Sequence, residues 1–74
     1  MSEWITREDV ERIAETVSEG LPAHKVFASR RNGYLALDLF NVDGVMVDML
    51  TAGTKREVYT YLQGMRRAQL LARG

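Results

Sequence analysis

The chain has 74 residues, with 10 Lys and Arg against 10 Asp and Glu, one His, one Pro and no Cys. This length accommodates a single domain over 1–74. The lack of Cys excludes disulfides and thiolate metal sites, and a single His excludes His-rich zinc sites. Because so small a domain buries little apolar surface and has no covalent cross-link, we expect it to gain stability as a homo-oligomer.

The overall composition is that of a folded globular protein, with 46% hydrophobic and 27% charged residues. No apolar run approaches the roughly 20 residues that a membrane-spanning helix needs. Residues 1–9 contain acids where a signal peptide has basic residues followed by an apolar stretch. We therefore expect a cytoplasmic protein with no membrane partner.

The net charge of zero conceals an uneven distribution along the chain. Residues 1–19 contain six Asp and Glu against two Arg, whereas residues 53–74 contain five Lys and Arg against one Glu. The acidic and basic parts can pair within one chain, pair between two chains, or present two different surfaces to two partners.

The first element is predicted to be a helix over about 7–19. Thr6 and Asp9 have the spacing of a capping box, and Gly20 with Pro22 stops the helix. Four apolar residues recur on one face at helical intervals, namely Val10, Ile13, Ala14 and Val17.

Three strands are predicted next, over about 24–30, 34–42 and 45–50. Asn32-Gly33 and Asp43-Gly44 separate them, and both dipeptides are typical of two-residue type I′ turns. The expected structure is therefore a three-stranded antiparallel meander. Two-residue turns would pair Ala28 with Leu37 and Phe40 with Val47.

Both faces of this sheet would be apolar. One face would hold Val26, Ala28, Leu35, Leu37, Leu39, Met46 and Leu50, and the other would hold Phe27, Tyr34, Ala36, Phe40, Val42, Val45, Val47 and Met49. A sheet with helices on one side only normally has a polar second face. We therefore expect either helices on opposite faces or a partner on one face. The contact with a second copy would use an edge strand, around Val26 or Met46, or one whole face.

The last element is predicted to be a helix over about 55–72, opened by a capping box of Thr54 and Glu57. The core-facing side of the helix would comprise Val58, Tyr61, Leu62, Met65, Ala68, Gln69 and Ala72. The fold class is thus α+β, a small single domain of α-β-β-β-α order in which two helices flank a three-stranded antiparallel meander.

The sequence contains no motif for catalysis or cofactor binding. His24 is expected in a loop or at a strand start, outside any nucleophile motif, and no glycine-rich phosphate loop is present. Asp38 and Asp48 interrupt apolar strands, but the expected register points them to opposite faces, which argues against a paired acid–base site. Asp38 would lie diagonal to Lys25, and Asp48 would share a face with Arg30. We therefore expect either ion pairs with these residues or exposure at a sheet edge.

Metal binding is also not expected. Asp38, Asn41 and Asp43 offer hard oxygen ligands, but they lack the spacing of a calcium-binding loop. We therefore predict a protein that is not an enzyme, with no catalytic residue, no cofactor and no metal site.

The outer side of the last helix is a candidate protein interface. Tyr59, Arg66, Leu70 and Arg73 would lie beside one another outside the core-facing side. Tyr and Arg are enriched at binding hot spots. The first hypothesis is therefore a small non-catalytic protein–protein interaction or regulatory module that forms a homodimer and can also bind an unidentified protein.

The alternative is a nucleic-acid-binding domain. Arg30 and Arg31 flank the first turn, and Lys55 and Arg56 begin the last helix, so these four side chains could bind phosphates. The α-β-β-β-α order, with Thr54-Lys55-Arg56 at the second helix, resembles double-stranded RNA-binding domains, and the resemblance implies RNA backbone contacts there. That family places a GPxH-type loop between its first two strands. Here the similar Gly20–His24 segment precedes the first strand, and the zero net charge argues against a large phosphate footprint.

Overall fold

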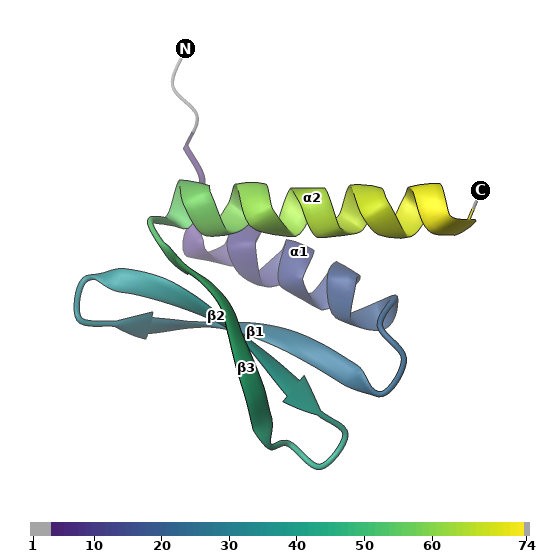
Figure 1. Ribbon diagram of the computed structural model, residues 1–74. Coiled ribbons are helices and arrows are strands. Elements are labelled where there is room, and N and C mark those ends of the chain that lie inside the picture. Colours follow the sequence, from purple (N-terminus) through teal and green to yellow (C-terminus); the bar gives the residue numbers. More distant parts are fainter. Residues whose placement is uncertain (1–3, 74) are drawn as a thin grey trace.

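The computed structural model describes residues 4–73 and has the expected α+β fold, with helix, three antiparallel strands and helix in that order (Figure 1). The elements are α1 (Arg7–Glu19), β1 (His24–Arg31), β2 (Tyr34–Asn41), β3 (Met46–Gly53) and α2 (Lys55–Arg73). Helix α1 has the expected bounds, and most other ends differ by at most one residue. The exception is β3, which continues three residues beyond the expected end.

Both helices begin with the capping box that the sequence predicts. In α1 the Asp9 N–H donates to Thr6 Oγ1 at 3.1 Å, and the Thr6 N–H donates to the Asp9 carboxylate at 3.0 Å. In α2 the Glu57 N–H donates to Thr54 Oγ1 at 3.1 Å, and the Thr54 N–H donates to Glu57 at 2.8 Å. Each box satisfies helix-start N–H groups that have no partner within the helix.

These caps lead to the first prediction. Thr6→Ala and Thr54→Ala should each lower the free energy of unfolding by about 1 kcal/mol, because each removes a hydroxyl that accepts from the helix start. Urea titrations followed by circular dichroism measure the change. Unchanged midpoints for both variants would contradict the cap assignment.

The first cap also predicts a dependence on pH. The Thr6 backbone N–H lowers the pKa of Asp9 below its ordinary value, with smaller contributions of the same sign from the Thr6 hydroxyl and from Arg12, against a raising effect of desolvation. A carboxylate with a depressed folded-state pKa stabilises the fold above its unfolded pKa of about 3.9, and that stabilisation is lost as the pH falls through the folded pKa. Asp9→Asn should therefore cost more stability at pH 6 than at pH 2, as urea titrations at the two pH values would measure. An equal loss at both would contradict this.

The sheet has the order β1-β2-β3, and its first turn is the expected one. Asn32 and Gly33 both have positive φ, and Arg31 pairs with Tyr34 across them. The second connection is longer than the predicted Asp43-Gly44 turn. The Asn41 side chain organises it, because its Oδ1 accepts the N–H groups of Asp43 at 2.9 Å and Val45 at 3.1 Å.

This longer connection changes the register of β3. Phe40 lies opposite Met46, so the predicted pairing of Phe40 with Val47 is wrong. The register shifts at two places, and Val47 and Leu50 have no residue directly opposite them in β2. Met46 consequently moves to the face that holds Phe40, which was not its predicted face.

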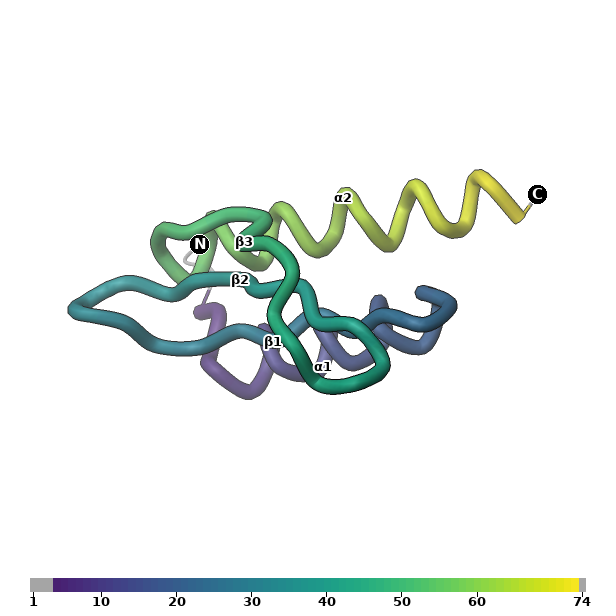
Figure 2. The backbone as a smooth tube through the Cα atoms, turned by 60° about the horizontal axis from the view of Figure 1, so that its bottom comes forward, coloured from purple at the N-terminus to yellow at the C-terminus, as the bar shows by residue number. Residues whose placement is uncertain are grey.

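Both helices pack on one face of the sheet, side by side and running in the same direction (Figures 1 and 2). The buried core joins all five elements and consists of Val10, Ala14, Val17, Val26, Ala28, Leu35, Leu37, Val58 and Leu62. The sequence left two arrangements open, helices on opposite faces of the sheet or a partner on one face. The first of these is wrong. No element within residues 4–73 covers the other face.

The core-facing side of α2 is rotated from the predicted one. Tyr59 packs against the core, whereas Tyr61, expected in the core, is exposed. Helix α2 contacts both the sheet and α1, so its buried side turns toward α1. Near its other end, Gln69 Nε2 donates to the Val17 carbonyl of α1 at 2.9 Å. Among residues 4–73, no helix combines the length and the apolarity needed to cross a membrane.

Candidate functional site

The most distinctive surface is the sheet face that the helices leave uncovered, called the open face here. Alternation along the strands and the observed pairing place the following residues on it: Lys25, Phe27, Ser29, Arg31, Tyr34, Ala36, Asp38, Phe40, Met46 and Met49. Of the apolar residues predicted for this face, Phe27, Tyr34, Ala36, Phe40 and Met49 lie on it, and they share it with the polar side chains in this list.

The apolar side chains of the open face are large and accessible. Phe27, Met46 and Met49 are each about half exposed. Phe27 and Phe40 contact each other edge to face, with ring centroids 6.5 Å apart and planes at 76°. Aromatic residues and Met are enriched at protein interfaces, so the composition of this face is typical of a contact surface.

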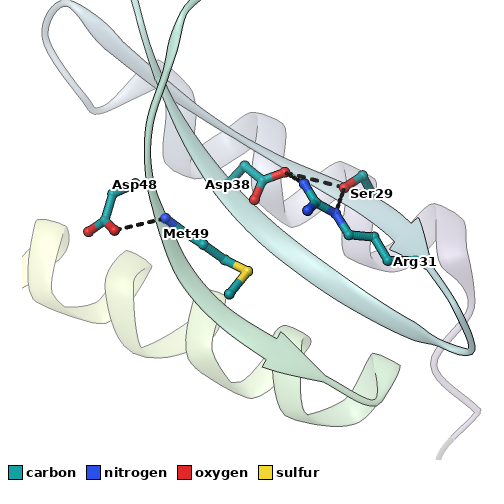
Figure 3. A network of polar contacts seen from close by, with 5 residues as sticks. All are labelled: Ser29, Arg31, Asp38, Asp48 and Met49. Atoms are coloured by element: carbon teal, nitrogen blue, oxygen red, sulfur yellow. Dashed lines mark hydrogen bonds and ion pairs between the residues drawn. The ribbon is translucent and has the colours of Figure 1, made fainter.

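A buried carboxylate lies in the middle of this apolar face. Asp38 is only 2% exposed although no helix covers it. Its Oδ2 accepts from Arg31 Nη2 at 2.8 Å and from Ser29 Oγ at 3.3 Å (Figure 3). Arg31 Nε also donates to Ser29 Oγ at 3.4 Å. The other carboxylate oxygen, Oδ1, is buried and has no hydrogen-bond partner.

The predicted partner of Asp38 was Lys25, and the structure corrects it to Arg31. Both are on β1 and both point to the open face, but Ser29 lies between Arg31 and Asp38. The short serine side chain leaves space for the guanidinium to pass over it.

The second strand carboxylate has a separate, local role. Asp48 points away from Asp38, as predicted, and its Oδ1 accepts the adjacent Met49 N–H at 2.8 Å (Figure 3). Asp48 is exposed on the edge strand β3, which agrees with the second of the two expectations for it. His24 is exposed, with Nδ1 3.2 Å from the Pro22 carbonyl oxygen.

The oxygen ligands considered for a metal also serve the fold. Asp38 binds Arg31, and Asn41 Oδ1 accepts two loop N–H groups. Within residues 4–73, no three His, Asp or Glu side chains gather in a group that could hold a metal ion.

The four residues of the predicted interface on α2 differ in exposure. Tyr59 packs against the core, and Arg66 is partly buried with Nη1 3.4 Å from Gln69 Oε1. Leu70 and Arg73 are exposed, near the end of the helix that extends past α1 (Figure 2). An interface at this end of α2 stays a prediction, with Leu70 as its accessible apolar residue.

The four predicted phosphate-binding residues do not gather at one place. Arg30 and Lys55 line one depression of about 290 Å³ together with Arg7 and Tyr34. Arg31 is bound to Asp38 on the open face. Arg56 lines another depression, beside Ile5 and Tyr59.

Ser18 on α1 binds the outer edge of β1, a role that the sequence did not predict. Ser18 Oγ on α1 accepts the Val26 N–H at 2.9 Å and donates to the Ala14 carbonyl at 2.8 Å. The edge of β1 around Val26, expected as a possible contact, is thus occupied by α1. A serine in the last turn of an amphipathic helix gives no sequence signal for this role.

Besides the predicted interface at the end of α2, two surfaces of the described residues are candidates for binding. One is the open face with Asp38 at its centre, and the other is the basic depression at the start of α2. Comparisons of the chain with protein-family models, with curated proteins and with solved structures found no match.

Proposed function

We propose that the protein is a small non-catalytic interaction module that self-associates through the open face. The observation that supports this is the set of half-exposed Phe27, Met46 and Met49 on a face that nothing in residues 4–73 covers. One face of an antiparallel sheet is normally polar when water covers it. Contiguous exposed apolar side chains instead mark sites of protein contact.

The size of the open face limits the surface area that a dimer can bury. Three strands of eight residues cover about 400 Å² per copy at usual strand dimensions. Two such faces give an interface at the small end of specific complexes, where association is weak and transient. We therefore propose a reversible dimer with a dissociation constant in the micromolar range.

The test places a charge in the open face. Phe27→Lys should raise the dimer dissociation constant at least tenfold, because it would bury an unpaired ammonium in an apolar contact. Sedimentation velocity over a concentration series measures the constant, and circular dichroism checks the fold. Leu71→Lys is the matched control, since Leu71 is 75% exposed on α2, away from the open face.

Two outcomes would contradict the proposal. Wild-type protein that stays monomeric up to about 500 μM would exclude even a weak dimer of this size. A loss of association in Leu71→Lys equal to that in Phe27→Lys would move the contact to α2, where Leu70 was predicted to take part.

The basic depression supports a second candidate function, binding of nucleic-acid phosphates. Arg7, Arg30 and Lys55 surround it, and the start of α2 adds the partial positive charge of a helix N-terminus. Duplex RNA binding should then weaken as salt rises, and should weaken further in Arg30→Ala/Lys55→Ala. Arg67→Ala/Arg73→Ala, at exposed positions of α2, removes the same charge elsewhere. An equal effect of the two double variants in fluorescence anisotropy would contradict a phosphate site at the depression.

A further inference from the structure

We propose that Arg31 of each copy donates a hydrogen bond to Asp38 Oδ1 of the other copy, so that two reciprocal ion pairs fix how the open faces dock. This inference rests on the proposed self-association and names the residues that determine its geometry. The two carboxylate oxygens of Asp38 differ in their hydrogen bonding, since only Oδ2 has partners.

The acceptor is a buried oxygen that the chain itself leaves unsatisfied. Asp38 Oδ2 receives two donors, whereas Oδ1 receives none. A buried acceptor without a partner costs free energy, and covering the face with a second apolar surface would remove the remaining water nearby. Docking of the open face therefore requires a donor from the partner at this position.

Asp38 has a flexible neighbour on the open face. Met49 lies directly across from Asp38 on β3 and is about half exposed (Figure 3). A methionine side chain is unbranched and adapts to irregular spaces. Movement of Met49 on docking would open a path from the partner to the carboxylate.

The donor is available on the same face. An arginine has five N–H donors in a fixed planar arrangement. Arg31 uses Nη2 for Asp38 and Nε for Ser29, and its side chain is 41% exposed. These two contacts hold the guanidinium in place, so little further ordering is needed for it to donate from Nη1.

The presence of both groups on one surface identifies the partner as a second copy. In a two-fold symmetric contact, each residue pair occurs twice with the roles exchanged. A spare donor and a spare acceptor on the same face therefore satisfy each other reciprocally. Sheets packed face to face lie about 10 Å apart, a separation that an arginine side chain from one sheet can bridge.

The decisive experiment mixes two variants, each lacking one partner of the ion pair. Asp38→Asn keeps Arg31, and Arg31→Gln keeps Asp38. Neither chain can form the ion pair internally, and neither homodimer can form it between chains. Only the mixed dimer retains one contact from Arg31 of one chain to Asp38 of the other.

We expect each variant homodimer to have a dissociation constant at least tenfold above that of wild type. The mixed dimer should bind at least tenfold more tightly than either variant homodimer. Sedimentation velocity with one chain fluorescently labelled measures all three constants. The internal ion pair is absent in every variant species. At about 0.5 M salt, which screens the attraction between the oppositely charged chains, a preference for the mixed dimer reports a close contact between the chains.

A mixed dimer no tighter than the variant homodimers would overturn this inference. If Phe27→Lys still abolished association in that case, self-association through the open face would stand without the reciprocal ion pairs. A wild-type protein that stays monomeric would overturn both the self-association and the ion pairs. Asp38→Asn removes the buried charge, whereas Arg31→Gln leaves the buried carboxylate without its cation, so Asp38→Asn is expected to fold even if Arg31→Gln does not. An unchanged dissociation constant for the Asp38→Asn homodimer would overturn the inference by itself.

Discussion

Leu37→Ala should lower the free energy of unfolding by about 3 kcal/mol, one of the largest effects expected of a single truncation in this chain. Leu37 is fully buried in the central strand β2 and belongs to the core that joins the sheet to both helices. A cavity there would have little room to collapse. Since small domains are stable by only about 5 kcal/mol, more than half of the stability would be lost.

Leu71→Ala is the matched control, because the same atoms are removed from a side chain that is 75% exposed. Its free energy of unfolding should change by no more than about 0.5 kcal/mol. Urea titrations of both variants, at a concentration where the protein is monomeric, give the comparison. Similar losses in the two variants would show that Leu37 is not at the centre of the core.

Ser18→Ala should cost about 2 kcal/mol, more than a typical surface change. It leaves the Val26 N–H on the outer edge of β1 without its acceptor on α1, at a residue that is buried. The uncovered edge would also become available to pair with another strand. We therefore expect a lower unfolding midpoint and a greater tendency to aggregate.

Thr16→Ala separates this effect from the loss of a helix hydroxyl. Thr16 Oγ1 donates only to the Arg12 carbonyl of its own helix, at 3.1 Å, and alanine favours the helix more than threonine does. Its stability should stay unchanged or rise slightly. Light scattering during thermal unfolding follows aggregation in both variants. Equal behaviour of Ser18→Ala and Thr16→Ala would show that Ser18 does not protect the edge.

Local signals in the sequence were sufficient for the helices and the first hairpin. The capping boxes at Thr6 and Thr54 place both helix starts, and Asn32-Gly33 places the first turn. The second hairpin was misjudged because the side chain of Asn41 builds a longer loop. The Asp43-Gly44 dipeptide looks the same in the sequence whether the loop is two residues long or longer. The sequence therefore does not reveal that the Asn41 side chain accepts the loop N–H groups.

Contacts between distant elements were less predictable. The exposed tyrosine of α2 is Tyr61 and the packed one is Tyr59, because α1 lies against α2, a placement that helical periodicity does not encode. The apolar residues on both sheet faces followed from the alternation of the strands, but which face the helices leave uncovered did not. The partner of Asp38 did not follow either, since it depends on the small volume of Ser29 between Arg31 and Asp38.

The side-by-side packing of α1 and α2 has a consequence for how the chain acquires its structure during synthesis. Val10 and Val17 near one end share a core with Val58 and Leu62 near the other, and Gln69 closes the last turn of α1. A nascent chain that ends before α2 thus has a sheet and a first helix with an incomplete core. Stable folding should begin only after α2 has left the ribosome, and until then the exposed strands are able to pair with other chains.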